Sequence, residues 1–284
     1  MKRRASRSGS GREIAMSSLG RNGRFGNQLF QYAFLNLYAK RYGLQVRTPA
    51  WIGQTLFGVR DMPVGRTYPV VNEKLIPQKE RLLTSAAPLY VDVDFWGYFQ
   101  LHTRHYAPYR EYIRSLFTPV PSVEARVASG VGKLRAMGKT VVGLHIRRGD
   151  YLSRQDHEIY GKLHYLAPAS WYRVWLDAVW SGLDRPVLFV ASDDPAAADE
   201  FREYNPVTSG RLAAALPEAG FYPDFYILSQ CDLLAISNST FSYMAGMLNR
   251  RGTVYMRPDL NAGKLLPYDP WNSPVNPWLY LIGY

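Results

Sequence analysis

Four residues that could do chemistry fall within six positions of the chain: His145, Arg147, Arg148 and Asp150. They come directly after the apolar run 141–144 and are joined by a glycine turn. Guanidinium groups bind phosphates and carboxylates through paired hydrogen bonds, and a carboxylate can orient an arginine or accept a proton. The cluster therefore suits a site for an anionic ligand, or else a set of structural ion pairs at a strand end.

The apolar residues before this cluster are typical of a buried parallel strand covered by helices on both faces. Alternate side chains of a strand share a face, so His145 and Arg147 should point one way, and Ile146 and Arg148 the other. Ligands of open α/β sheets bind at the carboxyl ends of the strands. The pattern therefore predicts that His145 and Arg147 face a site, while Arg148 has a structural role.

A second anion site is predicted where a short strand, 233–237, meets the helix 238–248. Ser239 and Thr240 place two hydroxyl groups at the start of that helix. Unpaired backbone N–H groups at a helix N-terminus stabilise phosphates and other anions. Taken alone, the Ser-Thr pair would be interpreted as an ordinary helix cap.

The chain opens with the same order of elements. An apolar run, 14–19, leads into the glycine-rich turn 20–26 and then into a helical pattern over 27–39. The turn exposes backbone amides at a helix N-terminus, although its spacing fits neither a Walker loop nor a dinucleotide fingerprint. The alternatives are an anion site and a plain strand-to-helix connection.

Asp92 and Asp94 form a D-x-D pair, which some glycosyltransferases use to hold a divalent metal. The alternative is the polar face of an edge strand, which short-spaced acids commonly form. The aromatic residues Trp96, Tyr98 and Phe99 follow at once, and they could either stack on a sugar or join the core. We favour the structural interpretation of the acid pair.

Another buried strand is predicted over 185–191, and it ends at Ser192, Asp193 and Asp194. Asp194 precedes Pro195, which is the pattern of an N-cap followed by proline in the first helical position. Asp193 is then the freer carboxylate at the carboxyl end of this strand.

Composition indicates a globular protein of 284 residues with 47% hydrophobic residues, which is long enough for two domains. Its one cysteine, Cys231, excludes an internal disulfide and a cysteine-cluster metal site. No apolar run is long enough to cross a bilayer, and the N-terminus lacks the apolar core of a signal peptide. We therefore expect a cytoplasmic protein.

The net charge of +11 is unevenly distributed. Five of the 34 basic residues lie in residues 1–12, which carry no acid, so the rest of the chain has 29 basic against 23 acidic residues. We expect residues 1–12 to be a disordered basic tail, able to hold the protein peripherally at an anionic inner membrane. The remaining excess suits an anionic ligand such as a nucleotide sugar, and no nucleic-acid-binding motif is present.

Four stretches resemble glycosyltransferase family 11, the α-1,2-fucosyltransferases of bacterial type. They are GRFGNQLFQYA at 23–33, GYFQ at 97–100, HIRRGDY at 145–151 and ISNSTFS at 236–242. Each is weak alone, but the four occur in the order of the family and span most of the chain. The chain departs from the family at Tyr243 and Met244, where members usually carry paired tryptophans.

The resemblance implies an α/β, GT-B-like fold with two Rossmann-like domains facing a cleft. Residues 13–137 would be the acceptor-side domain and 138–284 the GDP-sugar-binding domain, with the last roughly 28 residues packing back on the first. It also implies transfer of L-fucose from GDP-fucose to the 2-hydroxyl of a galactoside, with inversion and without a metal or other cofactor. The alternatives are a GDP-sugar transferase of other specificity, or a basic nucleotide- or nucleic-acid-binding protein that is not an enzyme.

The resemblance also assigns roles to residues. Arg147 would hold the β-phosphate, His145 would line the nucleotide pocket, and Asp224 would contact the guanosine. The remaining donor-binding residues would be Gly26, Asn27 and Gln28 from the first domain, and Asp193, Ser239, Thr240, Phe241 and Ser242 from the second. For the base that accepts the proton of the sugar hydroxyl, Asp150 is the first candidate, and Asp156 and Glu158 are alternatives.

Overall fold

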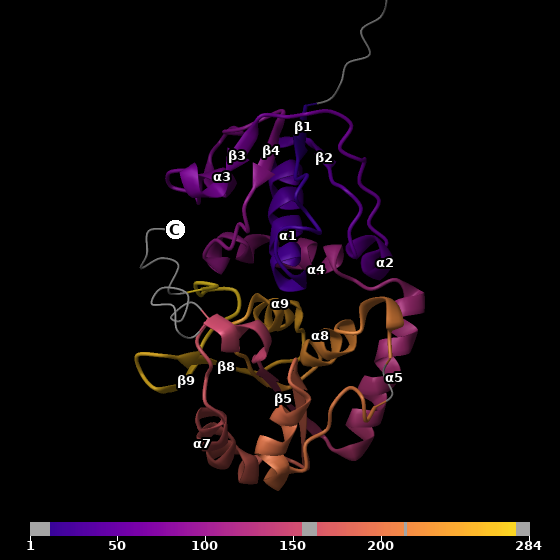
Figure 1. Cartoon of the computed structure of the whole chain (residues 1–284), viewed down its shortest axis with the longest axis vertical. Coiled ribbons are helices and arrows are strands. Elements are labelled where there is room, and N and C mark those ends of the chain that lie inside the picture. The colour runs from indigo at the N-terminus through magenta and orange to yellow at the C-terminus, as the bar shows by residue number, and fades with distance from the viewer. Residues whose placement is uncertain (1–11, 155–163, 213–214, 277–284) are drawn as a thin grey trace, which may run out of the picture.

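Two α/β units make up the chain, and they lie one above the other in Figure 1. The computed structural model describes residues 12–154, 164–212 and 215–276. The first unit contains a parallel four-stranded sheet in the order β2-β1-β4-β3. Its strands are β1 (Glu13–Ala15), β2 (Gln45–Arg47), β3 (Val70–Asn72) and β4 (Val93–Trp96).

The second unit contains a five-stranded sheet in the order β6-β5-β7-β8-β9, parallel except for the last pair. Its strands are β5 (Thr140–Ile146), β6 (Pro186–Ser192), β7 (Leu233–Ala235), β8 (Val254–Asp259) and β9 (Lys264–Pro267). The strands β5, β6 and β7, which the buried apolar runs predicted, are therefore parallel as expected.

The helices connect and cover these strands. The α-helices are α1 (Phe25–Tyr42), α2 (Gly53–Phe57), α3 (Arg81–Thr84), α4 (Arg110–Leu116), α5 (Pro121–Met137), α7 (Ala169–Val179), α8 (Tyr222–Leu228) and α9 (Thr240–Leu248). The 3₁₀ segments are η1 (Glu73–Leu75), η2 (Thr103–His105), η3 (Ala107–Tyr109), η4 (Gly149–Arg154), η5 (Trp180–Gly182), η6 (Pro195–Tyr204) and η7 (Pro217–Ala219).

Strand β5 lies between β6 and β7, and its residues after Thr140 are all buried. Val142, Leu144 and Ile146 belong to the core on one face of the sheet, whereas Val141 belongs to the core on the other. His145 shares the face of Val141, so the alternation expected from the sequence is confirmed. This alternation directs His145 toward α9 and the first unit.

The two units share one hydrophobic core. Phe30 of α1 packs against Tyr243 of α9 with ring centroids 6.2 Å apart. Further along, Arg114 of α4 donates a hydrogen bond to the carbonyl oxygen of Met247 at 3.2 Å. The backbone N–H of Thr103 reaches the Ser273 carbonyl at 3.1 Å, so the segment after β9 contacts the first unit. The units are therefore packed together, and a break between them would expose apolar surface.

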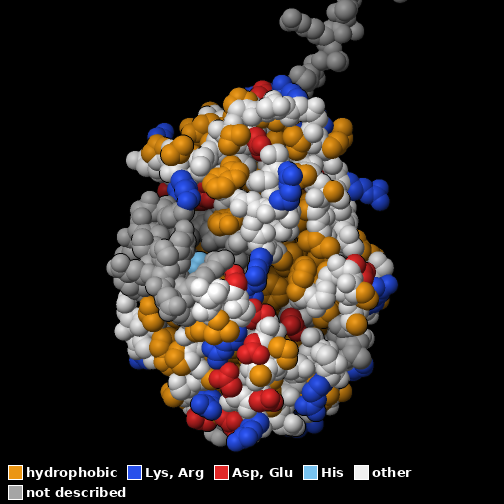
Figure 2. Space-filling model, in the orientation of Figure 1, with side chains coloured by type: hydrophobic (Ala, Val, Ile, Leu, Met, Phe, Trp, Pro, Cys, Tyr) orange, Lys and Arg blue, Asp and Glu red, His pale blue; other side chains and the backbone are white. Residues whose placement is uncertain are grey.

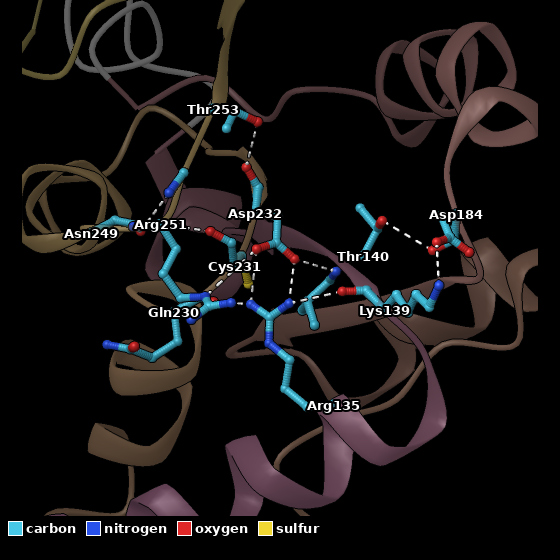
Figure 3. Close-up of polar contacts among 12 residues, drawn as sticks. Arg135, Lys139, Thr140, Asp184, Gln230, Cys231, Asp232, Asn249, Arg251 and Thr253 are labelled. Carbon is cyan, nitrogen blue, oxygen red and sulfur yellow. Dashed lines mark hydrogen bonds and ion pairs between the residues drawn. The ribbon is translucent and has the colours of Figure 1, made fainter.

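Helix α5, which the sequence division places with the first domain, packs mainly against the second (Figure 1). Its last turn carries Arg135, which forms an ion pair with Asp232 and donates to the Gln230 carbonyl at 2.7 Å (Figure 3). Asp232 also accepts the backbone N–H of Val141 at 2.8 Å. This network ties the start of β5 to α5 and to the segment before β7.

Burial alone would raise the pKa of Asp232, but the hydrogen bonds from Arg135 and from the Val141 N–H hold it below its ordinary value. Arg251 adds a second guanidinium, with its Nε 3.6 Å from the Asp232 carboxylate. The network thus anchors the amino end of β5, while the candidate site residues His145 and Arg147 lie at its carboxyl end. Within the described ranges, no helix is long and apolar enough to cross a membrane.

Candidate functional site

A cleft of about 1660 Å³ lies between the two units, at the carboxyl end of β5. In the space-filling view the surface is hollowed between the upper and lower halves, with hydrophobic side chains gathered along part of the hollow (Figure 2). Of the described candidates for donor binding and catalysis, all but one line this cleft. Those that line it are Gly26, Asn27, Gln28, His145, Arg147, Asp150, Asp193, Asp224, Ser239, Thr240 and Phe241.

The exception is Ser242, which is fully buried behind His145. Asp156 and Glu158, the alternative bases, lie outside the described residues. The cleft therefore collects side chains from sequence positions more than 200 residues apart.

The N-termini of α1 and α9 meet in the cleft. Helix α1 begins at Phe25, earlier than its apolar pattern suggested, so Gly26 and Asn27 lie in its first turn. A Cβ atom at Gly26 would lie 2.4 Å from the backbone nitrogen of Phe241 and 2.6 Å from the carbonyl carbon of Thr240. Only glycine permits this approach, which places two helix N-termini side by side.

Asn27 is bound from both units. Its Oδ1 accepts a hydrogen bond from the Thr240 hydroxyl at 2.9 Å and another from Nε2 of Gln100 at 2.9 Å. An amide oxygen has two lone pairs, so these donors occupy it fully. The orientation of the amide is thereby fixed, and its Nδ2 group is the part left to donate.

Two glutamines on α1 hold the glycine-rich turn that precedes the helix. Nε2 of Gln28 donates to the carbonyl oxygens of Gly23 at 3.1 Å and Gly20 at 3.4 Å. Gln31 is fully buried and donates to the carbonyl oxygens of Asn22 at 3.1 Å and Gly97 at 2.9 Å. Gln28 therefore lines the cleft but acts on the turn, which its side chain holds against the helix.

His145 lies at the floor of the cleft and is buried. Its Nδ1 is 2.8 Å from the Ser237 hydroxyl and 2.9 Å from the Ser242 hydroxyl, and its ring lies 5.2 Å from the Phe241 ring. Burial is the larger cause and the nearby charge of Arg147 the smaller, and together they lower the pKa of His145 to about 3. The ring is therefore neutral near pH 7, and two hydroxyls fix its orientation.

Arg147 is held between two carboxylates. It forms ion pairs with Asp150 and Asp193. Its guanidinium lies over the Tyr151 ring, with Cζ 5.3 Å from the ring centroid. Asp150 also pairs with Arg24 of the first unit at 3.3 Å. Arg147 thus points into the cleft in a fixed position, and Asp150 joins charges from both units.

The neighbouring arginine has a different environment, as the strand alternation predicted. Arg148 pairs with Glu200 of η6 at 2.9 Å and does not line the cleft. Asp193 is more constrained than its sequence context suggested, because it accepts from both Arg147 and the backbone N–H of Arg148, the latter at 2.8 Å. Asp194 caps η6, as expected, by accepting the Ala196 N–H at 3.0 Å.

A hydrophobic recess with one carboxylate forms part of the cleft wall in the second unit. Phe221 is 39% exposed there and packs against Phe25, with ring centroids 4.7 Å apart. Asp224 lines the same recess. Burial raises the pKa of Asp224 to about 6, although a hydrogen bond from Ser209 opposes the shift. A planar base with paired N–H donors fits such a recess.

The D-x-D pair lies elsewhere. Asp94 accepts hydrogen bonds from the backbone N–H and hydroxyl of Ser17, and Asp92 pairs with Arg66 at 2.8 Å and caps the Glu13 N–H at 3.3 Å. Neither carboxylate lines the cleft. In the part of the chain that the structure describes, no group of three or more His, Cys, Asp or Glu side chains is arranged to hold a metal.

A family model described as glycosyl transferase family 11 matches residues 5–264. The chain belongs to this family. The chain is similar to the galactoside alpha-(1,2)-fucosyltransferase 1 of Plecturocebus brunneus, with which it is 28% identical over 257 residues. The protein of the same name from Saimiri boliviensis boliviensis is 28% identical over 253 residues. Each alignment covers 83% of this chain and 66% of the relative, so the chain spans just under two thirds of their length.

Solved structures support the fold of this family 11 chain. The fucosyltransferase NodZ from Bradyrhizobium superposes with a TM-score of 0.59 at 14% identity, covering 92% of this chain and 99% of NodZ. A variant of Arabidopsis thaliana FUT1 in complex with GDP gives a TM-score of 0.61 at 12% identity, covering 94% and 76%. The GT-B-like arrangement of two α/β units around a cleft is confirmed.

Sequence reasoning missed three residues that shape the family 11 site. Gln100 belongs to a motif that carried the family resemblance, but no local pattern indicates that it reaches Asn27. Ser237 lies two residues after β7, and its contact with His145 depends on how β7 lies beside β5. Arg24 sits in the glycine-rich turn, and its ion pair with Asp150 requires both units. Each contact joins segments that are far apart in the chain.

Proposed function

We propose that this chain is a fucosyltransferase that moves L-fucose from GDP-fucose to the 2-hydroxyl of a galactoside, with inversion at the anomeric carbon and without a metal. One observation carries the proposal. In a family 11 chain, the N-termini of α1 and α9 meet within one cleft, which the Arg147 guanidinium also lines. Together they supply the positive potential that a nucleoside diphosphate needs as it leaves.

In this reaction the bond between fucose C1 and the β-phosphate oxygen breaks, and negative charge grows on the diphosphate. The guanidinium and the helix N–H groups are already oriented toward that charge, so they stabilise the transition state without reorganising. The acceptor oxygen forms its bond to C1 from the opposite face and loses its proton. Phe221 and Asp224 are suited to hold the guanine, with the ionised carboxylate accepting its N–H groups.

Asp150 is positioned to orient arginines more than to accept a proton. Its carboxylate is paired with both Arg147 and Arg24, and accepting a proton would weaken both ion pairs. Within the proposal, Asp150 holds Arg147 in place and links it to the first unit. The proton acceptor is then another carboxylate, with Asp156 and Glu158 the candidates from the sequence, or water.

The linkage is the finer part of the proposal. It is supported by the curated relatives, which are named galactoside alpha-(1,2)-fucosyltransferases. The alternative is a different linkage, because a structurally similar protein, NodZ, is an alpha-1,6-fucosyltransferase that was soaked with GDP-fucose. The shared part of both versions is transfer of fucose from GDP-fucose.

The test is to incubate the full chain with GDP-fucose and a panel of galactosides, in excess EDTA, and to determine the product linkage by NMR. An α-1,2-linked product supports the proposal in full. An α-1,6 or other fucoside would retain the donor and overturn the linkage, and activity restored only by manganese would overturn metal independence. Absence of GDP binding, together with salt-sensitive binding to oligonucleotides, would contradict the assignment as a transferase.

A further inference from the structure

Two large aromatic side chains remain exposed at the first unit's side of the cleft. Trp96, the last residue of β4, is 41% exposed, and Tyr98 is 38% exposed. Both line the cleft from the first unit, whereas Phe221 and Asp224 line it from the second. Phe99, the third aromatic of this segment, is fully buried instead. Aromatic rings of this size are usually covered, so their exposure in a cleft calls for a physical explanation.

The turn that presents these two rings is held firmly by its neighbours. One carboxylate oxygen of Glu73 accepts the backbone N–H groups of Tyr98 at 2.7 Å and Phe99 at 2.9 Å. The Phe99 ring stacks on Phe34 of α1, with centroids 3.9 Å apart and planes within 3°. The backbone that carries the exposed rings is therefore fixed in advance, which reduces the entropy lost when a ligand binds.

Gly97 lies between the two rings and makes this arrangement possible. Its φ is +158°, and a Cβ atom there would lie 2.3 Å from Cβ of Glu73 and 2.4 Å from its carboxylate. Its carbonyl oxygen accepts the buried side-chain amide of Gln31 at 2.9 Å. Any larger residue would push Glu73 away from the turn, so the backbone is shaped around that carboxylate.

The aromatic pair adjoins the centre where the helix N-termini meet. A Cβ atom at Gly23 would lie 2.8 Å from a ring carbon of Tyr98 and 2.6 Å from Nδ2 of Asn27, so Tyr98 covers the turn next to Asn27. Asn27 in turn bonds Thr240 at the start of α9. A ligand resting on the aromatic rings would therefore reach toward the place where the diphosphate departs.

We propose that Trp96 and Tyr98 form the acceptor subsite, on which the apolar face of a galactopyranoside ring stacks while its hydroxyl groups face the polar rim. This inference rests on the proposed function. The polar rim would be supplied by polar side chains of the segment 73–80, which lines the cleft and contacts the aromatic turn through Glu73. An apolar platform with a few polar groups beside it is the usual form of a site for an uncharged, hydroxyl-rich ligand.

The experiment measures binding and transfer separately on the full chain. Saturation-transfer NMR with methyl β-galactoside in the presence of GDP reports acceptor binding, and titration calorimetry reports the Kd for GDP. For Trp96→Ala and Tyr98→Ala we expect acceptor affinity to fall about ten-fold or more, as for other stacked rings, with the Kd for GDP unchanged. Trp96→Phe should recover part of the loss, because it restores a flat ring.

Phe221→Ala is the matched comparison, since Phe221 is exposed to a similar extent but lines the cleft from the second unit. This substitution should weaken GDP binding and leave galactoside binding unchanged. If the wild-type protein binds the galactoside and both alanine variants lose this binding, the subsite is supported whether or not fucose is transferred. A lack of fucose transfer would refute the proposed function and leave the subsite standing. The subsite is wrong if the wild type binds no galactoside. It is also wrong if Trp96→Ala weakens GDP binding and leaves galactoside binding unchanged.

Discussion

The hydroxyl group of Thr240 donates a hydrogen bond to Oδ1 of Asn27 across 2.9 Å, although the two residues are 213 positions apart. Asn27 lies in the first turn of α1 and Thr240 is the first residue of α9. This single bond therefore joins the two helix N-termini from which the proposed diphosphate site is built. Since Gln100 occupies the other lone pair of the same oxygen, the Asn27 amide has one orientation.

Removal of the Thr240 hydroxyl should impair the site more than the fold. In Thr240→Val the shape is kept, so we expect about 1 kcal/mol of lost stability and a kcat/KM lower by about ten- to a hundred-fold. Steady-state kinetics and thermal unfolding provide the measurement. Thr84→Val is the control, because Thr84 is exposed on α3 and its hydroxyl bonds only the Glu80 carbonyl, at 3.1 Å. If Thr240→Val lowers activity as strongly in an Asn27→Ala background as in the wild type, the two side chains do not act together.

A methyl group at position 26 should separate the two helices. Gly26→Ala would bring a Cβ atom within 2.4 Å of the Phe241 nitrogen, and we expect a loss of roughly 1–3 kcal/mol in stability together with loss of GDP binding. Denaturant unfolding and calorimetry test both effects. Gly132→Ala is the matched substitution within α5, where a Cβ meets nothing within 4 Å, and it should stabilise the protein by about 0.5–1 kcal/mol. Normal GDP affinity in Gly26→Ala would show that the close approach is unimportant.

The two adjacent arginines should give opposite results. Arg147→Ala removes a preorganised cation from the cleft, so the transfer rate should fall by about 10²–10³-fold. Arg148→Ala breaks the ion pair with Glu200 on the other face of the strand, so it should lower stability and leave the Kd for GDP as in the wild type. Kinetics and calorimetry on both folded variants decide the matter. Equal loss of GDP affinity in the two would contradict the division of faces.

Acid should weaken GDP binding through Asp224. Burial raises the pKa of Asp224 to about 6, and the proposed recognition of guanine needs the ionised carboxylate, so the affinity should be about ten-fold weaker at pH 5 than at pH 7. The free protein should instead become more stable in acid. Because the pKa of Asp224 is higher in the folded than in the unfolded protein, its protonation stabilises the fold below the unfolded pKa, and this stabilisation is lost as pH rises through 6. Asp224→Asn should abolish both dependences, and a pH-independent wild-type Kd would refute the assignment.

His145 and Asp193 show how much of the site could be predicted from sequence. Strand periodicity alone placed His145 on one face and Arg148 on the other, because a residue's face depends only on its parity within a buried strand. The general rule for open α/β sheets placed Asp193 at the same edge as Arg147. The family resemblance then supplied the candidates contributed by the first unit. Local patterns were sufficient wherever a residue's position followed from its own element.

Contacts between the units could not be predicted in this way. Nothing near Gln100 indicates a bond to Asn27, and nothing near Arg24 indicates an ion pair with Asp150, because each depends on how two sheets are packed together. The start of α1 was also misplaced, since Phe25 and Gly26 carry no capping signal and the helix is held there by tertiary contacts. The freedom expected of Asp193 was wrong for the same reason, as Arg147 and the Arg148 N–H occupy it.

The carboxylates on either side of Arg147 offset its charge before any donor binds. Asp150 and Asp193 each accept one hydrogen bond from the guanidinium, which has five N–H donors, so a diphosphate can be bound while both carboxylates keep the arginine in place. Because the positive charge is already offset by carboxylates of the protein, few mobile counterions would be released from the cleft on binding. Affinity for GDP should accordingly change little with ionic strength.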